Sequence, residues 1–168
     1  MEIEIVPVKQ SEKHILENLY QLYEYDFSEY TKLDIDKDGK YPVNIDFYWE
    51  GDGRWKPYFI KMSGTVMGFV IALLENMDVN PDPDHVVYDF MILKKYRRQG
   101  VGYSAAFKTF ELYQANWKLA QMEANQGAIF FWRKVIHDFT NGKYTENYRE
   151  DRKMYVQSFS TKQSGQNV

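Results

Sequence analysis

The sequence has 168 residues, of which 44% are hydrophobic, and a formal net charge of −3. This length is typical of one domain with a sizeable core, so we expect residues 1–160 to form a single domain and residues 161–168 to form a polar tail. The chain contains no cysteine, which excludes disulfide bonds, thiolate metal sites and a cysteine nucleophile.

The longest uninterrupted apolar run, residues 66–74, has nine residues, whereas a membrane-spanning helix needs about 20. The first ten residues lack the basic and apolar regions of a signal peptide. We therefore expect a cytoplasmic protein with no membrane partner.

Charge is divided unevenly along the chain. Residues 1–84 hold 8 Lys and Arg against 17 Asp and Glu, while residues 85–168 hold 13 against 7. The division favours an anionic ligand on the C-terminal half and a cationic ligand on the N-terminal half, but two solvated faces would give the same pattern.

The N-terminal half predicts strands and one long helix. Residues 2–8 alternate like a strand, and Ser11 is a plausible N-cap for a helix that ends near Tyr30. Residues 31–56 predict a long loop with one short helical turn. Residues 57–75 then predict two strands that meet in a hairpin at Ser63-Gly64.

The C-terminal half predicts alternating strands and helices. A strand at 85–93 begins with His85, which we expect at the surface. A helix, a strand, a second helix and a final strand follow at 100–114, 117–124, 127–139 and 152–160. This order predicts a mixed α/β domain with helices packed on one twisted sheet.

Gly100 and Gly102 follow a basic run, KKYRR, at the predicted start of a helix. The first amides of a helix have no internal partner and carry the positive end of its dipole, so they can bind phosphate oxygens. The dinucleotide-binding pattern would need a third glycine where Ala105 stands, and no P-loop lysine follows. The turn therefore predicts a pyrophosphate site or, equally, a tight turn with a solvated basic run.

The same basic run could in principle bind nucleic acid. The sequence pI is about 5.7, and no second basic cluster accompanies the run. We therefore predict no nucleic-acid partner.

Two segments resemble a known family. Residues 97–102 (RRQGVG) resemble the Arg/Gln-x-x-Gly-x-Gly/Ala motif of the GNAT superfamily of acyl-CoA-dependent N-acyltransferases. Residues 125–128 (NQGA), followed by IFFWRKV, resemble the family's Asn-x-x-Ala-x-x-Phe-Tyr segment. The resemblance is clearest over residues 88–136, and the ending FWRKVIHDFTNGKYTE is similar to a poorly characterised bacterial branch of predicted acetyltransferases.

The resemblance implies a GNAT-like fold: a central twisted, mostly antiparallel sheet of six to seven strands, with helices on both faces and strands four and five splayed. It implies acetyl-CoA or coenzyme A as the cofactor. The amides of residues 99–103 would hold its pyrophosphate, helped by the Ser104 hydroxyl, and its pantetheine arm would pair with strand four. The implied cofactor-binding residues are Phe90, Met91, Ile92, Arg97, Arg98, Gln99, Gly100, Val101, Gly102, Tyr103, Ser104, Asn125, Ala128, Phe131 and Trp132.

Asn125 would steady the pantetheine arm near its thiol. A simple helix N-cap is the alternative role, and both roles can coexist.

The reaction that the resemblance implies is attack of a primary amine on the acyl thioester within a ternary complex. An alkyl ammonium with a pKa near 10 must first lose a proton, so a base is useful. Asp89 on the predicted fourth strand is the first candidate, and Glu123 at the end of the fifth is the second. Each could equally form an ion pair with a neighbouring Lys or Arg.

Trp132 stands where many relatives carry a tyrosine that protonates the leaving thiolate. Indole cannot serve as that acid, but a thiol with a pKa of about 8.5 can leave largely as the thiolate. Tyr103, Tyr144 and Tyr148 are other sources of a hydroxyl. We interpret Trp132 as a core residue beside the cofactor arm, and a non-catalytic acyl-CoA-binding module remains the alternative function.

Residues 34–39 (DIDKDG) imitate the start of a calcium-binding EF-hand loop, but its twelfth position holds Ile45 in place of the required Glu. We predict no metal. With Tyr41, Phe47, Tyr48 and Trp49 nearby, the segment is also a candidate site for a cationic amine acceptor. The alternative is an exposed acidic loop whose aromatic side chains enter the core. The acceptor itself stays open, as does the choice between monomer and homodimer.

Overall fold

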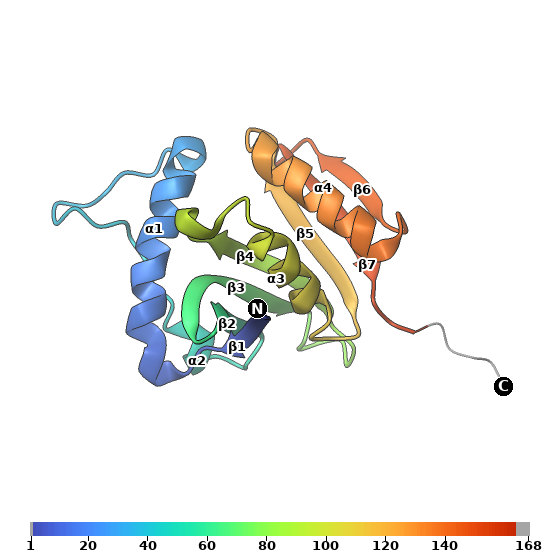
Figure 1. Ribbon diagram of the computed structural model, residues 1–168, viewed down its shortest axis with the longest axis horizontal. Helices are drawn as coiled ribbons and strands as arrows, with labels where there is room; N and C mark the ends of the chain where they lie inside the picture. The colour runs from blue at the N-terminus through green and yellow to red at the C-terminus, as the bar shows by residue number, and fades with distance from the viewer. Residues whose placement is uncertain (1, 164–168) are drawn as a thin grey trace.

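The computed structural model describes residues 2–163. Its elements are β1 (Ile3–Pro7), α1 (Lys13–Thr31), α2 (Phe47–Glu50), β2 (Trp55–Met62), β3 (Thr65–Glu75), β4 (Asp84–Ile92), α3 (Val101–Phe110), β5 (Asn116–Met122), α4 (Gln126–Thr140), β6 (Thr145–Arg149) and β7 (Met154–Ser160) (Figure 1). Of the predicted tail, residues 164–168 lie outside the described residues. None of the helices in residues 2–163 is long and apolar enough to cross a membrane.

One seven-stranded sheet runs through the domain in the order β1-β2-β3-β4-β5-β7-β6. Every neighbouring pair is antiparallel except β4 and β5, which are parallel. The predicted mostly antiparallel GNAT-like sheet is therefore confirmed. The sequence interpretation missed β6, because this edge strand is mostly exposed and carries no apolar alternation.

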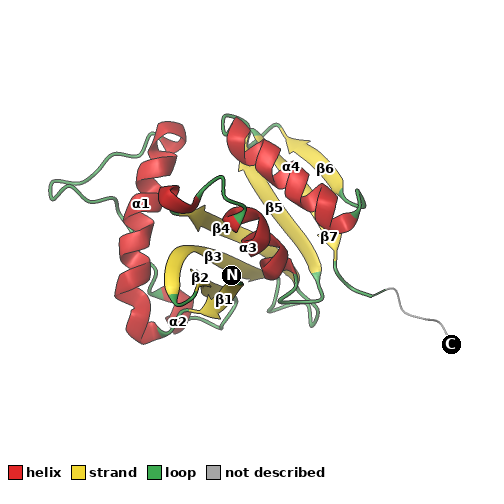
Figure 2. Cartoon of the chain, in the orientation of Figure 1, coloured by secondary structure: helices red, strands yellow, loops and turns green. Residues whose placement is uncertain are grey.

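Helices cover both faces of the sheet (Figure 2). On one face, α1 and α2 pack over a cluster that includes Leu16, Tyr20, Phe69 and Met91. On the other face, α3 and α4 pack over a larger cluster. The sheet thus separates two hydrophobic cores. A gap between two of its strands would connect the two faces.

A β-bulge bends β4 away from β5. Ile71 of β3 lies opposite Asp89, whereas Ala72 lies opposite Val87, so Tyr88 has no partner on β3. A bulge of this kind bends the strand that carries it. Consistent with this, β4 pairs with β5 only at His85↔Trp117 and Val86↔Lys118. The predicted splay of strands four and five is therefore confirmed.

Gly68 allows β3 to follow the bent strand. A Cβ atom at this position would lie 1.9 Å from the carbonyl oxygen of Met91, which no side chain tolerates. The backbone of β4 near its C-terminal end is therefore held by a contact that only glycine permits.

The predicted hairpin is confirmed, since Ser63 and Gly64 join β2 to β3 with φ angles of 50° and 78°. These positive angles fit the primed turns of tight hairpins. The predicted cap at Ser11 is wrong. Ser11 lies within a short 3₁₀ helix, Gln10–Glu12, and α1 begins after Glu12 without a side-chain cap.

His85 is buried, with 7% of its surface exposed, so the prediction of a surface residue is wrong. Its ring packs against Tyr113 and Trp117, at centroid distances of 4.5 and 5.4 Å. The position lies where β4 and β5 still pair, and this closed end of the gap is filled by side chains from both strands.

Candidate active site

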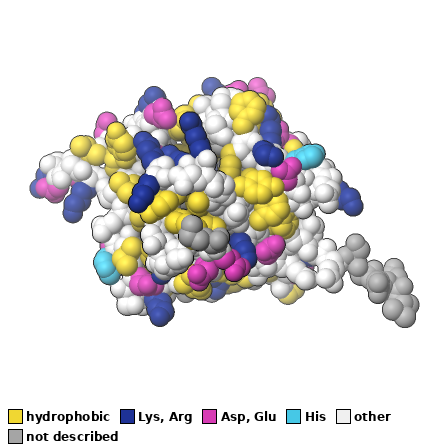
Figure 3. Space-filling view, viewed as in Figure 1, with side chains coloured by type: hydrophobic (Ala, Val, Ile, Leu, Met, Phe, Trp, Pro, Cys, Tyr) yellow, Lys and Arg dark blue, Asp and Glu magenta, His cyan; other side chains and the backbone are white. Residues whose placement is uncertain are grey.

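The splay between β4 and β5 opens into a cleft of about 830 Å³. Its walls come from β4, the turn before α3, the first turn of α3, β5, the first turns of α4 and the C-terminal half of α1. Figure 3 shows Lys and Arg side chains gathered around the start of α3 and the C-terminal end of α1 on this face of the molecule. The cleft therefore has a positively charged mouth.

The turn into α3 presents free backbone amides to this cleft. Arg98 and Gly100 have φ angles of 60° and 80°, and the first helical hydrogen bond joins Ser104 N to Gly100 O at 3.0 Å. The three amides between them, from Val101 to Tyr103, thus have no carbonyl partner within the helix. Such amides, at the positive end of the helix dipole, form an anion site.

Gly102 keeps this turn open. A Cβ atom here would meet the Ile92 and Phe131 side chains at 3.4 and 3.5 Å. Any longer side chain would extend into the space between the turn and α4. The turn, the end of β4 and the start of α4 therefore fit the diphosphate and pantetheine parts of coenzyme A.

Twelve of the fifteen predicted cofactor residues line the cleft: Phe90, Met91, Ile92, Arg97, Arg98, Gly100, Gly102, Tyr103, Asn125, Ala128, Phe131 and Trp132. Gln99, Val101 and Ser104 are not among the lining residues. The Gln99 side chain donates to Lys95 O at 2.7 Å, Val101 is buried in the core and Ser104 is exposed.

Arg97 connects the turn to α1. Its Nε donates to Ile92 O at 2.6 Å, and its guanidinium pairs with Asp26 of α1. Lys94 Nζ also lies 3.5 Å from Asp26. The Arg97 charge therefore already has a partner in this structure.

Asn125 and Trp132 form part of the α4 wall. The Asn125 side chain accepts a hydrogen bond from Ala128 N at 3.1 Å, so it caps α4, and it also lines the cleft. Trp132 is buried and packs edge-to-face against Phe90, with ring centroids 5.0 Å apart. Both residues thus combine a structural contact with a position at the cleft.

Asp89 lies on the opposite side of the sheet from α4, where two tyrosines of α1 reach it. Tyr20 Oη donates to one carboxylate oxygen at 2.6 Å and Tyr23 Oη to the other at 2.8 Å. Tyr48 Oη lies 2.6 Å from Tyr20 Oη. Burial raises the pKa of the Asp89 carboxyl above its usual value, although the two tyrosine hydrogen bonds act to lower it.

Asp89 itself is not among the residues that line the cleft, but Tyr23 is. Burial, together with the neighbouring Asp89 charge, also raises the pKa of Tyr23, so its hydroxyl keeps its proton near neutral pH. Tyr23 therefore connects the cleft to the carboxylate through one hydrogen bond.

Glu123 lies elsewhere. It is exposed after the end of β5, accepts a hydrogen bond from Tyr148 Oη at 3.2 Å and does not line the cleft. Neither carboxylate lines the cleft, but Asp89 is connected to it by the hydrogen bond from Tyr23.

The sequence interpretation missed the α1 side of the cleft. Tyr23, Phe27 and Tyr30 line it, and the rings of Tyr23 and Phe27 stack with centroids 4.5 Å apart. Their spacing of four and three residues places them on one helix face. That aromatic stripe was the available signal, although a stripe of this kind is equally typical of a core-facing helix.

The acidic loop that we considered as an acceptor site does not line this cleft. Its residues 34–40 are exposed, and the Asp36 carboxylate accepts from Asp38 N and Lys40 N at 2.8 and 3.0 Å. Tyr48 is buried in the core under α1. Within residues 2–163, no group of three His, Asp or Glu side chains could hold a metal ion.

Comparison with known proteins agrees with this geometry. A model of the Acetyltransferase (GNAT) family matches residues 16–137, which include most of α1, β4, the turn into α3, β5 and most of α4. The chain belongs to the GNAT acetyltransferase family. The predicted enzyme class, an acyl-CoA-dependent acetyltransferase that uses acetyl-CoA, is confirmed at the level of this family.

Solved structures of GNAT proteins share the fold. An acetyltransferase from Thermus thermophilus superimposes with a TM-score of 0.67 at 12% identity, covering 95% of this chain and 97% of that chain. The ribosomal-protein-S18-alanine N-acetyltransferase from Escherichia coli gives 0.62 at 12% identity, with 99% and 98% covered. An acetyltransferase from Bacillus subtilis in complex with CoA gives 0.55 at 14% identity, with 95% and 97% covered. A search of curated protein sequences found no significant match.

Proposed function

We propose that this GNAT protein transfers an acetyl group from acetyl-CoA to a primary amine by direct attack within a ternary complex. The observation that carries the proposal is the cleft itself, which has free helix amides on one side and, on the other, Tyr23 hydrogen-bonded to Asp89 behind it. The Bacillus subtilis neighbour, solved with CoA, supports the choice of donor. The Escherichia coli neighbour, whose name describes acetylation of a protein alanine, makes a peptidyl amine one of the acceptors to test.

The turn and α4 would bind the donor. The amides at the start of α3 would hold its diphosphate, while the edge of β4 exposed by the splay would pair with its pantetheine arm. Asn125, at the cleft wall, could contact the same arm while it caps α4. A bound acetyl-CoA supplies an activated thioester, and these residues would fix its position.

The amine would lose its proton toward Asp89. An ammonium at the cleft can give its proton to the Tyr23 oxygen as the Tyr23 proton moves to Asp89, so no tyrosinate accumulates. The raised pKa of Asp89 favours this role, because a base works best when its pKa lies nearer the working pH.

The neutral amine then forms a bond to the thioester carbon, the carbon–sulfur bond breaks, and the nitrogen releases to solvent the second proton that it carries after the attack. The coenzyme A sulfur leaves as the thiolate, which needs no acid because a thiol has a pKa near 8.5. Trp132 in place of an acid is therefore compatible with turnover, and its buried ring would instead pack beside the arm.

Titration calorimetry with coenzyme A and acetyl-CoA tests the donor site. We expect native protein to bind both, and Gly102→Glu to bind at least about 100-fold more weakly, because the added carboxylate fills the space beside the free amides and repels phosphate. Gly127→Ala is the matched control, since Gly127 also lines the cleft but a Cβ there meets nothing within 4 Å.

Acetyl transfer is then tested with a panel of polyamines, aminoglycosides and peptides with free N-termini. Release of the coenzyme A thiol measures the reaction with each amine. Turnover of one class identifies the acceptor. Binding without turnover on any amine would favour the acyl-CoA-binding module, and absence of binding by native protein would overturn the proposed function.

A further inference from the structure

A buried amide lies in the cleft wall. Gln121 of β5 lines the cleft, yet only 4% of its surface is exposed. Its side chain points to the same side of the sheet as Trp117 and Leu119, which belong to the core under α3 and α4. A polar group in such a position needs partners, since an unpaired buried amide costs about 1–3 kcal/mol.

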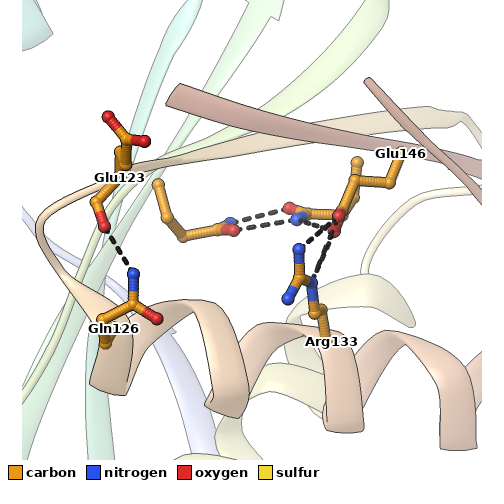
Figure 4. A network of polar contacts seen from close by, with 6 residues as sticks. Glu123, Gln126, Arg133 and Glu146 are labelled. Atoms are coloured by element: carbon orange, nitrogen blue, oxygen red, sulfur yellow. Dashed lines mark hydrogen bonds and ion pairs between the residues drawn. The ribbon is translucent and has the colours of Figure 1, made fainter. Parts of the chain in front are cut away.

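Among the residues that the structure describes, the Gln121 amide has one hydrogen-bond partner, Gln157 of β7. Gln121 Nε2 donates to Gln157 Oε1 at 2.7 Å, and Gln157 Nε2 donates back at 2.8 Å. Gln157 Nε2 also donates to the Glu146 carboxylate at 2.8 Å. Figure 4 shows Glu146 facing Arg133 of α4, whose guanidinium donates to both carboxylate oxygens.

This network fixes the orientation of both amides. A carboxylate can only accept hydrogen bonds, so the nitrogen of Gln157 must face Glu146. The oxygen of Gln157 must then face Gln121, and Gln121 must present its nitrogen in return. Arg133 holds the carboxylate in place, so the orientation is set by an ion pair outside the cleft.

One N–H group of this network has no acceptor among residues 2–163. Gln157 uses both of its side-chain N–H groups, whereas Gln121 uses one of its two within the part of the chain that the structure describes. Because Gln121, unlike Gln157, lines the cleft, a bound molecule is the partner that we assign to its second N–H. The surrounding wall includes Leu119, Trp132 and Val135, and an apolar wall strengthens such a hydrogen bond.

The register of the strands places Gln121 at the reacting end of the cleft. His85 pairs with Trp117, and because the bulge at Tyr88 adds one residue to β4, Gln121 falls at the level of Asp89 and Phe90, across the gap. The anion site lies beyond the end of β4 at Ile92. The group beside Gln121 is therefore the acyl end of the donor rather than its diphosphate.

We propose that Gln121 donates its free N–H to the thioester carbonyl oxygen of acetyl-CoA. The inference rests on the proposed function. As the amine nitrogen bonds to the carbonyl carbon, the carbonyl electron pair moves onto the oxygen, and it returns when the sulfur leaves. A fixed donor at this oxygen binds the thioester and stabilises the charge that develops on it. Gln121 is thus a thioester-binding residue.

Side-chain amide NMR of native protein provides a direct test. We expect one Nε2 proton of Gln121 to move downfield when acetyl-CoA is added, and to stay in place with S-ethyl-CoA, in which a methylene replaces the carbonyl. A shift with both ligands would place the contact elsewhere on the cofactor and overturn the assignment. No shift with either bound ligand would also overturn it.

Calorimetry with the same two ligands measures how much the Gln121 hydrogen bond contributes to the binding of acetyl-CoA. The variant Gln121→Met/Gln157→Met replaces the amide pair together, so neither amide is left unpaired by loss of the other. We expect the preference for acetyl-CoA over S-ethyl-CoA to fall by about 3- to 10-fold, the range for one neutral hydrogen bond. The matched control is Gln126→Met, since Gln126 is exposed and its amide contacts only Glu123 O among the described residues (Figure 4).

If the double variant keeps the native preference for acetyl-CoA over S-ethyl-CoA, the Gln121–Gln157 pair has only a structural role and the inference is overturned. If native protein binds neither ligand, the proposed function fails first, which separates the two failures.

Discussion

The two sides of the cleft are built in different ways. The cofactor wall, formed by the turn 97–103 and α4, uses backbone amides, glycine and a helix cap, each of which depends on residues within a few positions in the sequence. The α1 wall, where Tyr23 lines the cleft and Asp89 lies behind it, uses side-chain hydroxyls and a carboxylate from residues 66 or more positions apart. Backbone recognition of a phosphate requires a particular local turn, whereas side-chain recognition of an amine can be assembled from any part of the fold.

The largest expected effect comes from the α1 wall. Asp89→Asn should lower kcat/KM with the acceptor found by the amine panel by about 10²–10⁴-fold, because the amine loses its proton acceptor. Coenzyme A affinity should stay within about twofold, since Asp89 does not line the cleft. Steady-state kinetics and calorimetry measure the two quantities.

Glu123→Gln is the companion variant for that experiment, because Glu123 is exposed outside the cleft. A larger loss of turnover in Glu123→Gln than in Asp89→Asn would exchange the roles of the two carboxylates. Loss of coenzyme A binding in Asp89→Asn would instead show that the two walls are not independent.

A smaller effect should separate the two tyrosines that contact Asp89. Tyr23→Phe and Tyr20→Phe each remove one hydrogen bond to the carboxylate, but only Tyr23 lines the cleft. If Tyr23 passes the proton, Tyr23→Phe should lower kcat/KM by about 10- to 100-fold, well beyond the effect of Tyr20→Phe. Equal losses in the two variants would mean that the tyrosines only position Asp89.

The same contrast explains which parts of the site were predictable. RRQGVG revealed the turn before α3, because positive φ angles restrict the residues that can stand there. Asn125 was predictable for the same reason, as a cap at a defined helix start. Tyr23 was not, because its contact with Asp89 depends on how α1 packs across β4.

The strand β6 and the residue His85 show where hydrophobic periodicity fails to predict structure and burial. β6 is an exposed edge strand whose residues carry no apolar alternation, so no pattern marks it. His85 has a polar side chain but is covered by the rings of Tyr113 and Trp117. In both cases the neighbours that decide burial come from other elements, and the sequence around the position does not contain them.

The buried carboxylate of Asp89 should also make the stability of the protein depend on pH. Because burial raises the pKa of Asp89 in the folded protein, the folded state binds a proton more tightly than the unfolded chain. The wild type should therefore lose stability relative to Asp89→Asn as the pH rises from about 4, where an unfolded Asp titrates. At pH 7 we expect the variant to be more stable by about 1 kcal/mol in urea unfolding, with the difference vanishing toward pH 4. A less stable variant at pH 7 would show that the tyrosine hydrogen bonds outweigh the cost of burial.

The smallest effect should come from the ion pair that joins the two walls. Asp26→Asn removes the negative partner of Arg97 and leaves the guanidinium free beside the anion site. We expect coenzyme A to bind about 2- to 5-fold more tightly at low salt, as for a partly exposed ion pair, and the gain to shrink as salt screens it. Asp151→Asn, which disrupts an exposed pair with Arg149 away from the cleft, should change nothing.

The sign of the Asp26→Asn effect decides between two descriptions of the cleft. Tighter binding would mean that Asp26 competes with the cofactor for Arg97, so that donor binding loosens α1 and the two walls are coupled through this arginine. Weaker binding would mean that Asp26 holds Arg97 in place for the cofactor, with its Nε anchored on Ile92 O. In that case Asp26 of α1 contributes to the donor site through Arg97. The cofactor wall would then depend on a side chain from the α1 wall as well as on backbone amides.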